Sequence, residues 1–332
     1  MIVWADRWQA SGCVDVCLSK LAEVLEAPDV DAALRTIPEA VQRAAGFSSI
    51  QPTCEKWLVE QFGDVFAIIT GAELLQSFCA LSFSVLLWWA VLDGLVVHTE
   101  NDVAVLLALW HDGEVGKQCS EEEVAQLGQL LRVGHLTTIF RRVMLPQLAW
   151  FHGHVAEMNT FAVLWDHYGV NSPELSARIG IEFPAAWSAS ARNGVLPPDA
   201  SNRGTIVMQV PEAELSQMLQ KDTAGEYNEF VYSASYWYGY FWLTKITLKD
   251  GLFGGFVYCA PHGPVPAAAC VKYTSAMNGE SCGPTFIGNR GAGWGKANIF
   301  LDIADPITSL EQLQPRISDG CLEARFELKD IN

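Results

Sequence analysis

The chain has 332 residues, of which 50% are hydrophobic and 18% are charged. A composition this apolar can bury large cores, which excludes an intrinsically disordered chain. Asp and Glu number 38 against 21 Lys and Arg, so the formal net charge is −17 at pH 7. Binding to phosphate groups requires Lys and Arg, so this charge argues against nucleic acid and anionic membranes as partners.

The cysteine content and the first residues indicate the cellular compartment. Nine Cys residues stand in a chain whose opening sequence, MIVWADRW, lacks the basic head and apolar middle of a secretory signal. We therefore expect reduced thiols in a cytoplasmic or nuclear protein. The most apolar stretch, residues 78–92, is shorter than the roughly 20 residues that a membrane-spanning helix needs. We expect a helix buried in protein there and no membrane segment.

The first half of the chain has the 3.6-residue periodicity of amphipathic helices. Apolar side chains recur at this spacing in three segments: Val14, Cys17, Leu18, Leu21 and Leu25; Cys54, Trp57, Leu58 and Phe62; and Val103, Leu106, Leu107 and Trp110. Two helix starts are marked by a hydroxyl residue with an acidic residue three positions later: Thr99 with Asp102, and Ser120 with Glu123. Such pairs can cap the first turn of a helix. Since the connectors are short, we predict an array of antiparallel helices.

Beyond about residue 178 the periodicity changes to the two-residue alternation of strands. The alternation is clearest at residues 322–329, and it recurs at residues 245–249 and 299–303. Repeated short strands with one polar face predict an antiparallel β-sandwich. The helix-rich and strand-rich halves are segregated, so the predicted fold class is a multi-domain α + β protein. We place the boundary near residues 170–178.

Two glycine-containing motifs suggest catalytic chemistry, and each lacks a required part. The run at residues 288–296 has Arg290 and Ala297 where a phosphate loop needs Gly and a magnesium-binding Ser or Thr. The sequence G-E-S-C-G at residues 279–283 matches a nucleophile elbow around Ser281, but a strand-like run follows where the elbow needs a helix. We expect turns at both motifs, with no nucleotide cofactor and no catalytic residue. A hydrolase using Ser281 is the less favoured alternative.

A short histidine cluster raises the question of a metal site. His152 and His154 could offer two imidazoles, with Asp166 and His167 further along the chain. Zinc requires three or four convergent ligands, and nothing in the sequence fixes the geometry of these four side chains. We expect the two histidines at a helix end and predict no bound metal, with a metal-dependent enzyme kept as an alternative.

The N-terminal part of the chain resembles the end of a BTB/POZ domain followed by a BACK domain. The phrase A-D-R-W-Q at residues 5–9, which precedes a helix with a cysteine, is similar to the last helices of a BTB/POZ domain. Residues 93–103, followed by Trp110 and by L-P-Q-L at residues 145–148, resemble the core and closing stretch of a BACK domain. The resemblance implies a C-terminal BTB/POZ remnant at residues 1–26 and a BACK-like helical domain at residues 27–170.

The C-terminal part is similar, more loosely, to a MATH or TRAF-like sandwich. The resemblance rests on G-W-G at residues 293–295, I-F-L at 299–301 and D-G-C-L at 319–322, and it implies such a sandwich over residues 178–332. Many relatives carry an aromatic residue at the position of Lys296. By this resemblance we assign five residues to a partner-binding surface: Trp294, Gly295, Lys296, Trp237 and Tyr240.

The combined resemblance implies a function. Proteins that join BTB, BACK and such a sandwich act as substrate adaptors of cullin-type E3 ubiquitin ligases, in which the terminal domain captures the target. It implies a protein target for the C-terminal domain and a cullin scaffold for the N-terminal helices. Because the chain begins where a BTB domain ends, we expect a truncated form that has lost ligase recruitment as one version of this function. The residues themselves point to an interaction module and not an enzyme, and a sandwich that binds carbohydrate or another small ligand is the alternative.

Overall fold

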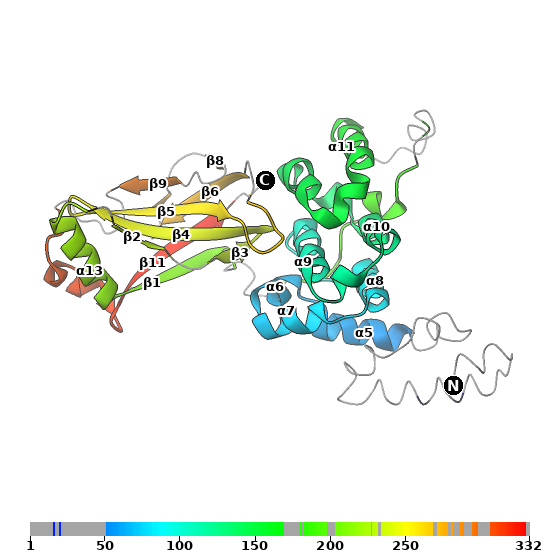
Figure 1. Ribbon diagram of the computed structural model, residues 1–332, viewed down its shortest axis with the longest axis horizontal. Coiled ribbons are helices and arrows are strands. Elements are labelled where there is room, and N and C mark those ends of the chain that lie inside the picture. The colour runs from blue at the N-terminus through cyan, green and yellow to red at the C-terminus, as the bar shows by residue number, and fades with distance from the viewer. Residues whose placement is uncertain are drawn as a thin grey trace. The chain divides into compact units, whose positions relative to one another are not determined.

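The computed structural model describes residues 16, 20, 51–168, 180, 182–197, 203–226, 228–231, 234–267, 271–277, 280–281, 286–288, 294–297 and 306–329. The predicted BTB/POZ remnant at residues 1–26 lies outside these ranges except for Val16 and Lys20, as does the predicted strand at residues 299–303. The chain divides into two compact units (Figure 1). The helical unit comprises Met1–His135 and Ala149–Leu196, and the strand unit comprises Leu136–Leu148 and Pro197–Asn332.

The helical unit is an array of short helices, as the periodicity predicted. Its α-helices are α5 (Gln51–Phe62), α6 (Val65–Thr70), α7 (Ala72–Cys79), α8 (Phe83–Val91), α9 (Glu100–Asp112), α10 (Glu121–Leu130) and α11 (Val155–Tyr168). Short 3₁₀ turns connect or extend them at η2 (Gly116–Gln118), η3 (Val133–His135), η6 (Ala149–His154) and η7 (Ala185–Ser188).

Both predicted helix starts are confirmed. At α10, the Glu123 amide donates to the Ser120 hydroxyl at 3.2 Å, and the Ser120 amide donates to the Glu123 carboxylate at 2.8 Å. At α9, the Asp102 carboxylate accepts from the amides of Thr99 at 3.3 Å and His98 at 2.9 Å. Each cap satisfies amides that the first helical turn leaves without an intrahelical partner.

The apolar stretch at residues 78–92 is two helices and not one. Helices α7 and α8 meet at an angle of 114°, because Ser82, which precedes α8, has an extended backbone. In the described part of the chain no single helix has the length and hydrophobicity to span a membrane, while the bent pair α7 and α8 passes that test when its lengths are combined. Trp89 and Trp110 are fully buried, and their indole nitrogens donate to the carbonyls of Phe62 at 2.8 Å and Leu81 at 3.0 Å.

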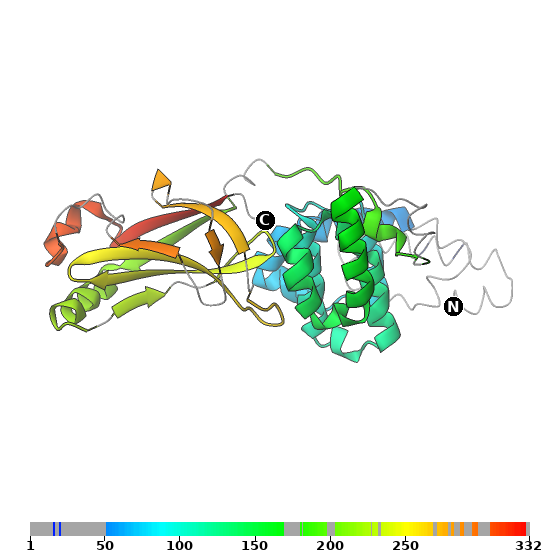
Figure 2. The same cartoon turned by 90° about the horizontal axis from the view of Figure 1, so that it is seen from above.

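The strand unit contains two antiparallel sheets. Their strands are β1 (Thr205–Pro211), β2 (Asn228–Val231), β3 (Ser235–Trp237), β4 (Tyr240–Lys249), β5 (Leu252–Ala260), β6 (Val271–Met277), β7 (Glu280–Ser281), β8 (Phe286–Gly288), β9 (Trp294–Ala297), β10 (Ile317–Ser318) and β11 (Cys321–Lys329). One sheet has the order β1-β11-β6-β7, with β10 beside β11 and β8 beside β6, and the other has the order β2-β4-β5-β9, with β3 beside β4. Figure 2 shows the β4–β5 hairpin running along the unit. The predicted α + β class, with helices first and antiparallel sheets second, is confirmed at this level.

The predicted alternation along β11 is confirmed, since Leu322, Ala324 and Phe326 are buried between exposed or half-buried charged residues. One helix in the strand unit, α13 (Glu212–Thr223), was not predicted. It is fixed at its end by Asp222, whose carboxylate accepts from the amide of Gly251 at 2.7 Å in the β4–β5 turn.

Three two-residue turns set the strand register. Tyr238 and Gly239, Asp250 and Gly251, and Asp319 and Gly320 all have positive φ. They join β3 to β4, β4 to β5 and β10 to β11. Paired positive φ values match the right-handed twist of the flanking strands, which explains the Asp-Gly sequences.

The two compact units are divided differently from the boundary predicted near residues 170–178. Residues 182–196 belong to the helical unit, because Trp187 is fully buried there. Leu136–Leu148 belongs to the strand unit and holds a π-helical turn, η4 (Phe140–Met144), followed by η5 (Leu145–Gln147). The Phe140 ring lies 5.7 Å from the Tyr240 ring. A long-range aromatic contact of this kind leaves no trace in local periodicity.

Candidate functional site

A strap of the chain, residues 182–196, lies on the helical unit and buries two of its side chains there. Apart from one 3₁₀ turn, η7, the described strap has no helix or strand. Trp187 is fully buried, and the Arg192 side chain is 0% exposed. In contrast, Val195 and Leu196 are 85% and 43% exposed. The strap therefore has two buried side-chain anchors, and its backbone is also hydrogen-bonded to the helical unit at Ala189, Ser190 and Asn193.

The first anchor is a slot for Trp187 against α10 and η6. The indole nitrogen donates to the Gly128 carbonyl at 2.8 Å, and the ring centroid lies 5.5 Å from Phe161 and 6.1 Å from Phe151. Gly128 leaves room for the His154 ring, from which a Cβ there would lie only 2.2 Å, and the His154 ring centroid lies 6.0 Å from that of Trp187. The slot thus combines aromatic contact with one directed hydrogen bond.

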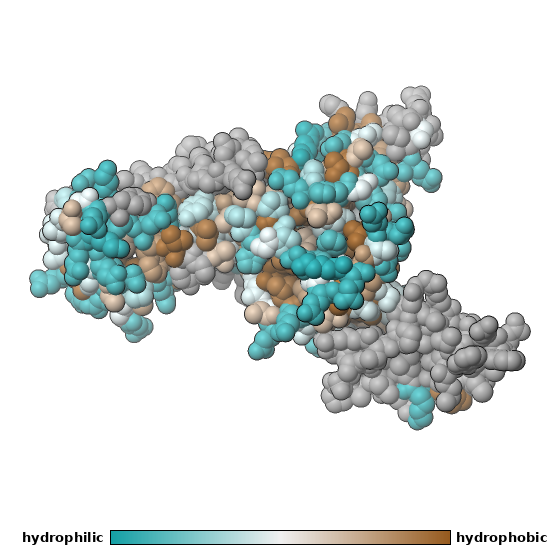
Figure 3. Space-filling view, in the orientation of Figure 1, coloured by the Kyte–Doolittle hydropathy of each residue, from teal (hydrophilic) through white to brown (hydrophobic). Residues whose placement is uncertain are grey.

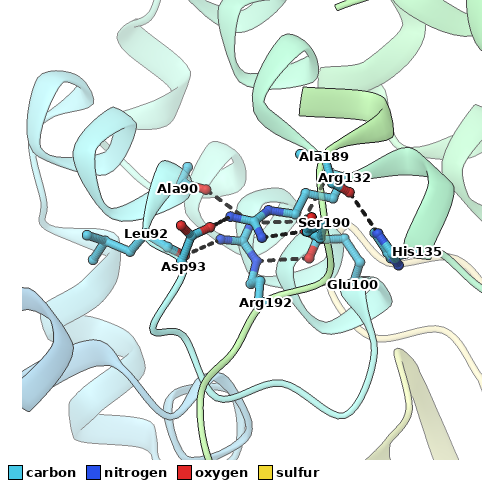
Figure 4. Close-up of polar contacts among 9 residues, drawn as sticks. All are labelled: Ala90, Leu92, Asp93, Glu100, Arg132, His135, Ala189, Ser190 and Arg192. Atoms are coloured by element: carbon cyan, nitrogen blue, oxygen red, sulfur yellow. Dashed lines mark hydrogen bonds and ion pairs between the residues drawn. The ribbon is translucent and has the colours of Figure 1, made fainter. Parts of the chain in front are cut away.

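The second anchor is a pocket that surrounds the guanidinium group of Arg192 (Figure 4). Its Nε and Nη2 atoms donate to the two carboxylate oxygens of Glu100 at 2.9 and 2.8 Å. Its Nη1 donates to the Leu92 carbonyl at 2.6 Å, and Nη2 also donates to the Ala90 carbonyl at 3.0 Å. The Glu100 side chain is only 2% exposed. Four hydrogen bonds compensate for removing this charge pair from water.

Arg132 joins the strap to the same carboxylate. Its amide donates to Glu100 at 3.1 Å, while Nη1 donates to the Ser190 carbonyl at 2.7 Å and Nη2 pairs with Asp93. These contacts connect the start of α9, the end of α10 and the strap in one network. Beside them, His135 Nε2 donates to the next strap carbonyl, that of Ala189, at 2.8 Å.

The two carboxylates of this network act as acceptors for arginine side chains. Glu100 and Asp93 are each paired with a guanidinium group. Asp93 and Glu100 lie within residues 93–103, which resemble the core of a BACK domain, and no binding role was predicted for them. Arg192 was missed, because nothing local indicates that it folds back to Glu100.

The structure shows where the residues of the candidate catalytic and metal-binding motifs lie. Ser281 lies on strand β7, opposite Ala276 of β6, and residues 279 and 282–283 of its predicted motif lie outside the described residues. His154 is buried, with Nε2 donating to the Ala125 carbonyl at 2.7 Å, while His152 is exposed. Within the described ranges, no group of three or more His, Cys, Asp or Glu side chains is placed to hold a metal ion.

The described thiols that show a pKa shift are poor nucleophiles. Burial raises the pKa of Cys54 to about 11 and that of Cys79 to about 11. Burial also raises the pKa of Cys119. A nucleophilic cysteine needs a lowered pKa to form the thiolate at neutral pH.

Two of the predicted partner-binding residues are packed inside the strand unit. Tyr240 is fully buried, with its ring 5.9 Å from Trp242. Trp237 is 8% exposed, and it packs so close to Gly204 that a Cβ there would lie 2.9 Å from its indole nitrogen. The assignment of these two residues to a partner-binding surface is therefore corrected, since neither presents its ring to solvent in this structure.

The other three predicted residues lie together on β9. Trp294, Gly295 and Lys296 pair with Val257, Phe256 and Gly255 of β5. In the described part of the sheet, β9 is the terminal strand and β5 is its paired neighbour. This places the G-W-G-K sequence at a sheet edge.

A cluster on the half-buried face of the same sheet was not predicted. Lys245 of β4 lies with its Nζ 5.4 Å from the centre of the Phe256 ring and 5.9 Å from that of Tyr258, and it pairs with Glu229 at 2.9 Å. Val231, which is opposite Lys245 on β2, is 44% exposed. Figure 3 shows a small hydrophobic patch over this sheet beside the hydrophilic surface over α13.

Comparison with known proteins gives no assignment, since neither the known family models nor the curated proteins contain a match to this chain.

Proposed function

We propose that this protein is an interaction module whose strand unit binds a segment of a partner protein along the edge strand β9. The observation that carries the proposal is the position of β9, with its G-W-G-K sequence, at the end of the five-stranded sheet in the described chain. An edge strand offers backbone hydrogen-bonding groups to an added strand, and neighbouring side chains then provide specificity.

The surface beside β9 supplies such side chains. Phe256 stands opposite Gly295 in the strand register, and Lys245 and Tyr258 follow on the adjoining strands. Aromatic rings and a lysine with an acidic neighbour suit a mixed apolar and acidic peptide better than a nucleic acid, given the net charge of −17.

The wider proposal keeps the family resemblance. In it, the two sheets form a MATH- or TRAF-like sandwich, the helices form a BACK-like domain, and the chain acts in the cytoplasm or nucleus as a substrate adaptor of a cullin-type ligase. Retention of the full chain on a purified cullin scaffold tests the ligase link. A chain that binds a protein target but is not retained by any cullin is an interaction module without ligase recruitment.

Site-specific photocrosslinking tests the binding surface. A photoreactive amino acid at position 296 is compared with one at Lys221, which is exposed on α13. We expect a discrete protein adduct from position 296 and none from position 221. Equal labelling from both positions, or labelling by a glycan and not a protein, would contradict the proposal.

The partner identified in this way then allows a binding measurement. We expect Trp294→Ala to weaken binding by about 2 kcal/mol, the size of an interface hot spot. The control is the thermal midpoint of the variant. A fall in stability as large as the fall in binding assigns Trp294 to packing instead.

A further inference from the structure

The strap contacts the helical unit as a bound peptide contacts its receptor. In the described strap, Trp187 is the single fully buried residue, and Arg192, five positions later, contributes a buried side chain. Peptides that bind grooves commonly rely on a few buried anchors of these types, with Trp and Arg among the most frequent. Residues between and after the anchors remain half-buried or exposed.

The acceptors around Arg192 belong to the end of α8 and the start of α9. The carbonyls of Ala90 and Leu92 stand at the C-terminal end of α8, where the helix dipole favours a positive charge. Glu100 is the first residue of α9, and the Arg132 amide holds its carboxylate in place. Backbone geometry and this second hydrogen bond therefore preform three acceptors that together accept four guanidinium hydrogen bonds.

The pocket is selective for guanidinium. Two parallel hydrogen bonds to one carboxylate, with further donors directed at two carbonyls, match the planar fork of arginine. A lysine ammonium can make three hydrogen bonds, but it cannot span both Glu100 oxygens and both carbonyls from one planar group. The Trp slot adds a second point of recognition, because it combines aromatic contacts with a Gly128 carbonyl that accepts from the indole nitrogen.

We infer that the helical unit carries a peptide-binding site for an extended segment with Trp and Arg five positions apart. The strap occupies this site in cis, and a segment of the same chemistry from another polypeptide can replace it. The inference concerns the helical unit and does not rest on the binding surface proposed for β9, so the two can fail independently.

The first experiment tests the guanidinium pocket in the full chain. Arg192→Ala removes the native occupant, and N-ethylguanidinium is then titrated while the thermal midpoint is recorded, with N-propylammonium as the matched cation. We expect guanidinium to raise the midpoint of Arg192→Ala and propylammonium to have no such effect. Neither cation should raise the midpoint of the wild type or of a variant that also carries Glu100→Gln. If N-ethylguanidinium changed the thermal midpoint equally in all variants, the assignment of a guanidinium-binding pocket would be overturned.

The second experiment tests occupation in trans. A fluorescent peptide of residues 182–196 is titrated into the full chain carrying Trp187→Ala and Arg192→Ala, and anisotropy is measured. We expect saturable binding of this peptide to the double variant. Its affinity for the wild-type chain should be at least tenfold lower, because the chain's own strap competes. A peptide with Arg192→Lys should also bind the double variant at least tenfold more weakly.

If the double variant does not fold by circular dichroism, the single variant Arg192→Lys takes its place. This variant retains the charge and the Trp187 anchor and weakens the pocket contact. Absence of saturable binding to a folded variant would overturn the inference, as would equal binding of the Lys peptide.

Discussion

Glu100 and Arg192, which are 92 residues apart in the chain, form a two-point ion pair with both side chains buried. Breaking such a pair leaves a charge in a low-dielectric environment without its partner, and this costs far more than losing a surface pair. We expect Glu100→Ala to lower the free energy of unfolding of the helical unit by about 3–5 kcal/mol, measured by urea denaturation.

The matched control for that prediction is Glu60→Ala. Glu60 pairs with Lys56 at 3.7 Å in the same unit, with side chains 58% and 77% exposed. An exposed pair of this type contributes on the order of 0.5 kcal/mol or less. Equal effects of the two substitutions would show that the Glu100 pair is not desolvated as described.

Two substitutions of Trp187 distinguish the contribution of ring packing to stability from that of the indole hydrogen bond. Trp187→Phe retains a ring in the slot but leaves the Gly128 carbonyl without its donor, and we expect a loss of about 1–2 kcal/mol. Trp187→Ala also empties the slot, and we expect about 3–5 kcal/mol. Calorimetric unfolding of both variants measures the difference, and indistinguishable variants would exclude a contribution from the ring.

Two glycines at equivalent positions in hairpin turns, Gly251 and Gly320, allow a controlled comparison of substitutions. Gly251 and Gly320 have φ of 77° and 73°, so alanine at either should cost about 1 kcal/mol in backbone strain. A Cβ at position 251 would also lie 2.5 Å from Pro306, whereas at position 320 no atom lies within 4 Å. We expect Gly251→Ala to destabilise the strand unit by a further 1–3 kcal/mol or so. A thermal melt that gives the same midpoint for both would contradict the docking of Pro306 on the turn.

Burial of Cys54 predicts slow alkylation in the folded chain. With a pKa of about 11 against an ordinary value of 9.0, the thiolate fraction near pH 8 falls roughly a hundredfold. Peptide mapping after brief iodoacetamide treatment, with and without urea, measures this difference. Rapid labelling of Cys54 in the native chain would contradict its burial.

The same shift predicts how stability depends on pH. The folded chain retains the Cys54 proton between about pH 9 and pH 11, while the unfolded chain releases it. The folded state then binds more protons, so the free energy of unfolding falls as pH rises through this window. Cys54→Ala should reduce the slope across this window, measured by denaturation, and the remaining slope should reflect Cys79, whose pKa is also raised to about 11.

Features encoded by neighbouring residues could be predicted from the sequence. The caps at Ser120 and at the start of α9 depend on residues three positions apart, and the alternation along β11 reflects the two-residue repeat of a strand. The break at Ser82 could not be predicted, because hydrophobicity alone does not distinguish one buried helix from two.

The candidate site was the least predictable part, since it is built from distant segments. Arg192 lies in a stretch without periodicity, and its partner is fixed by the path of the strap and not by spacing. Tyr240 was assigned to a surface by resemblance, and its burial against Phe140 reflects another long-range contact. Strand order within the sheets also depends on pairings that local sequence does not specify.

The 92-residue separation between Glu100 and Arg192 has a consequence for protein synthesis. A ribosome adds about 5–20 residues per second, so roughly 5–18 s pass after Glu100 is polymerised before its arginine is available. Throughout that interval the Glu100 carboxylate has been synthesised but its guanidinium partner has not, so a chaperone or a foreign arginine-bearing sequence can reach that carboxylate first.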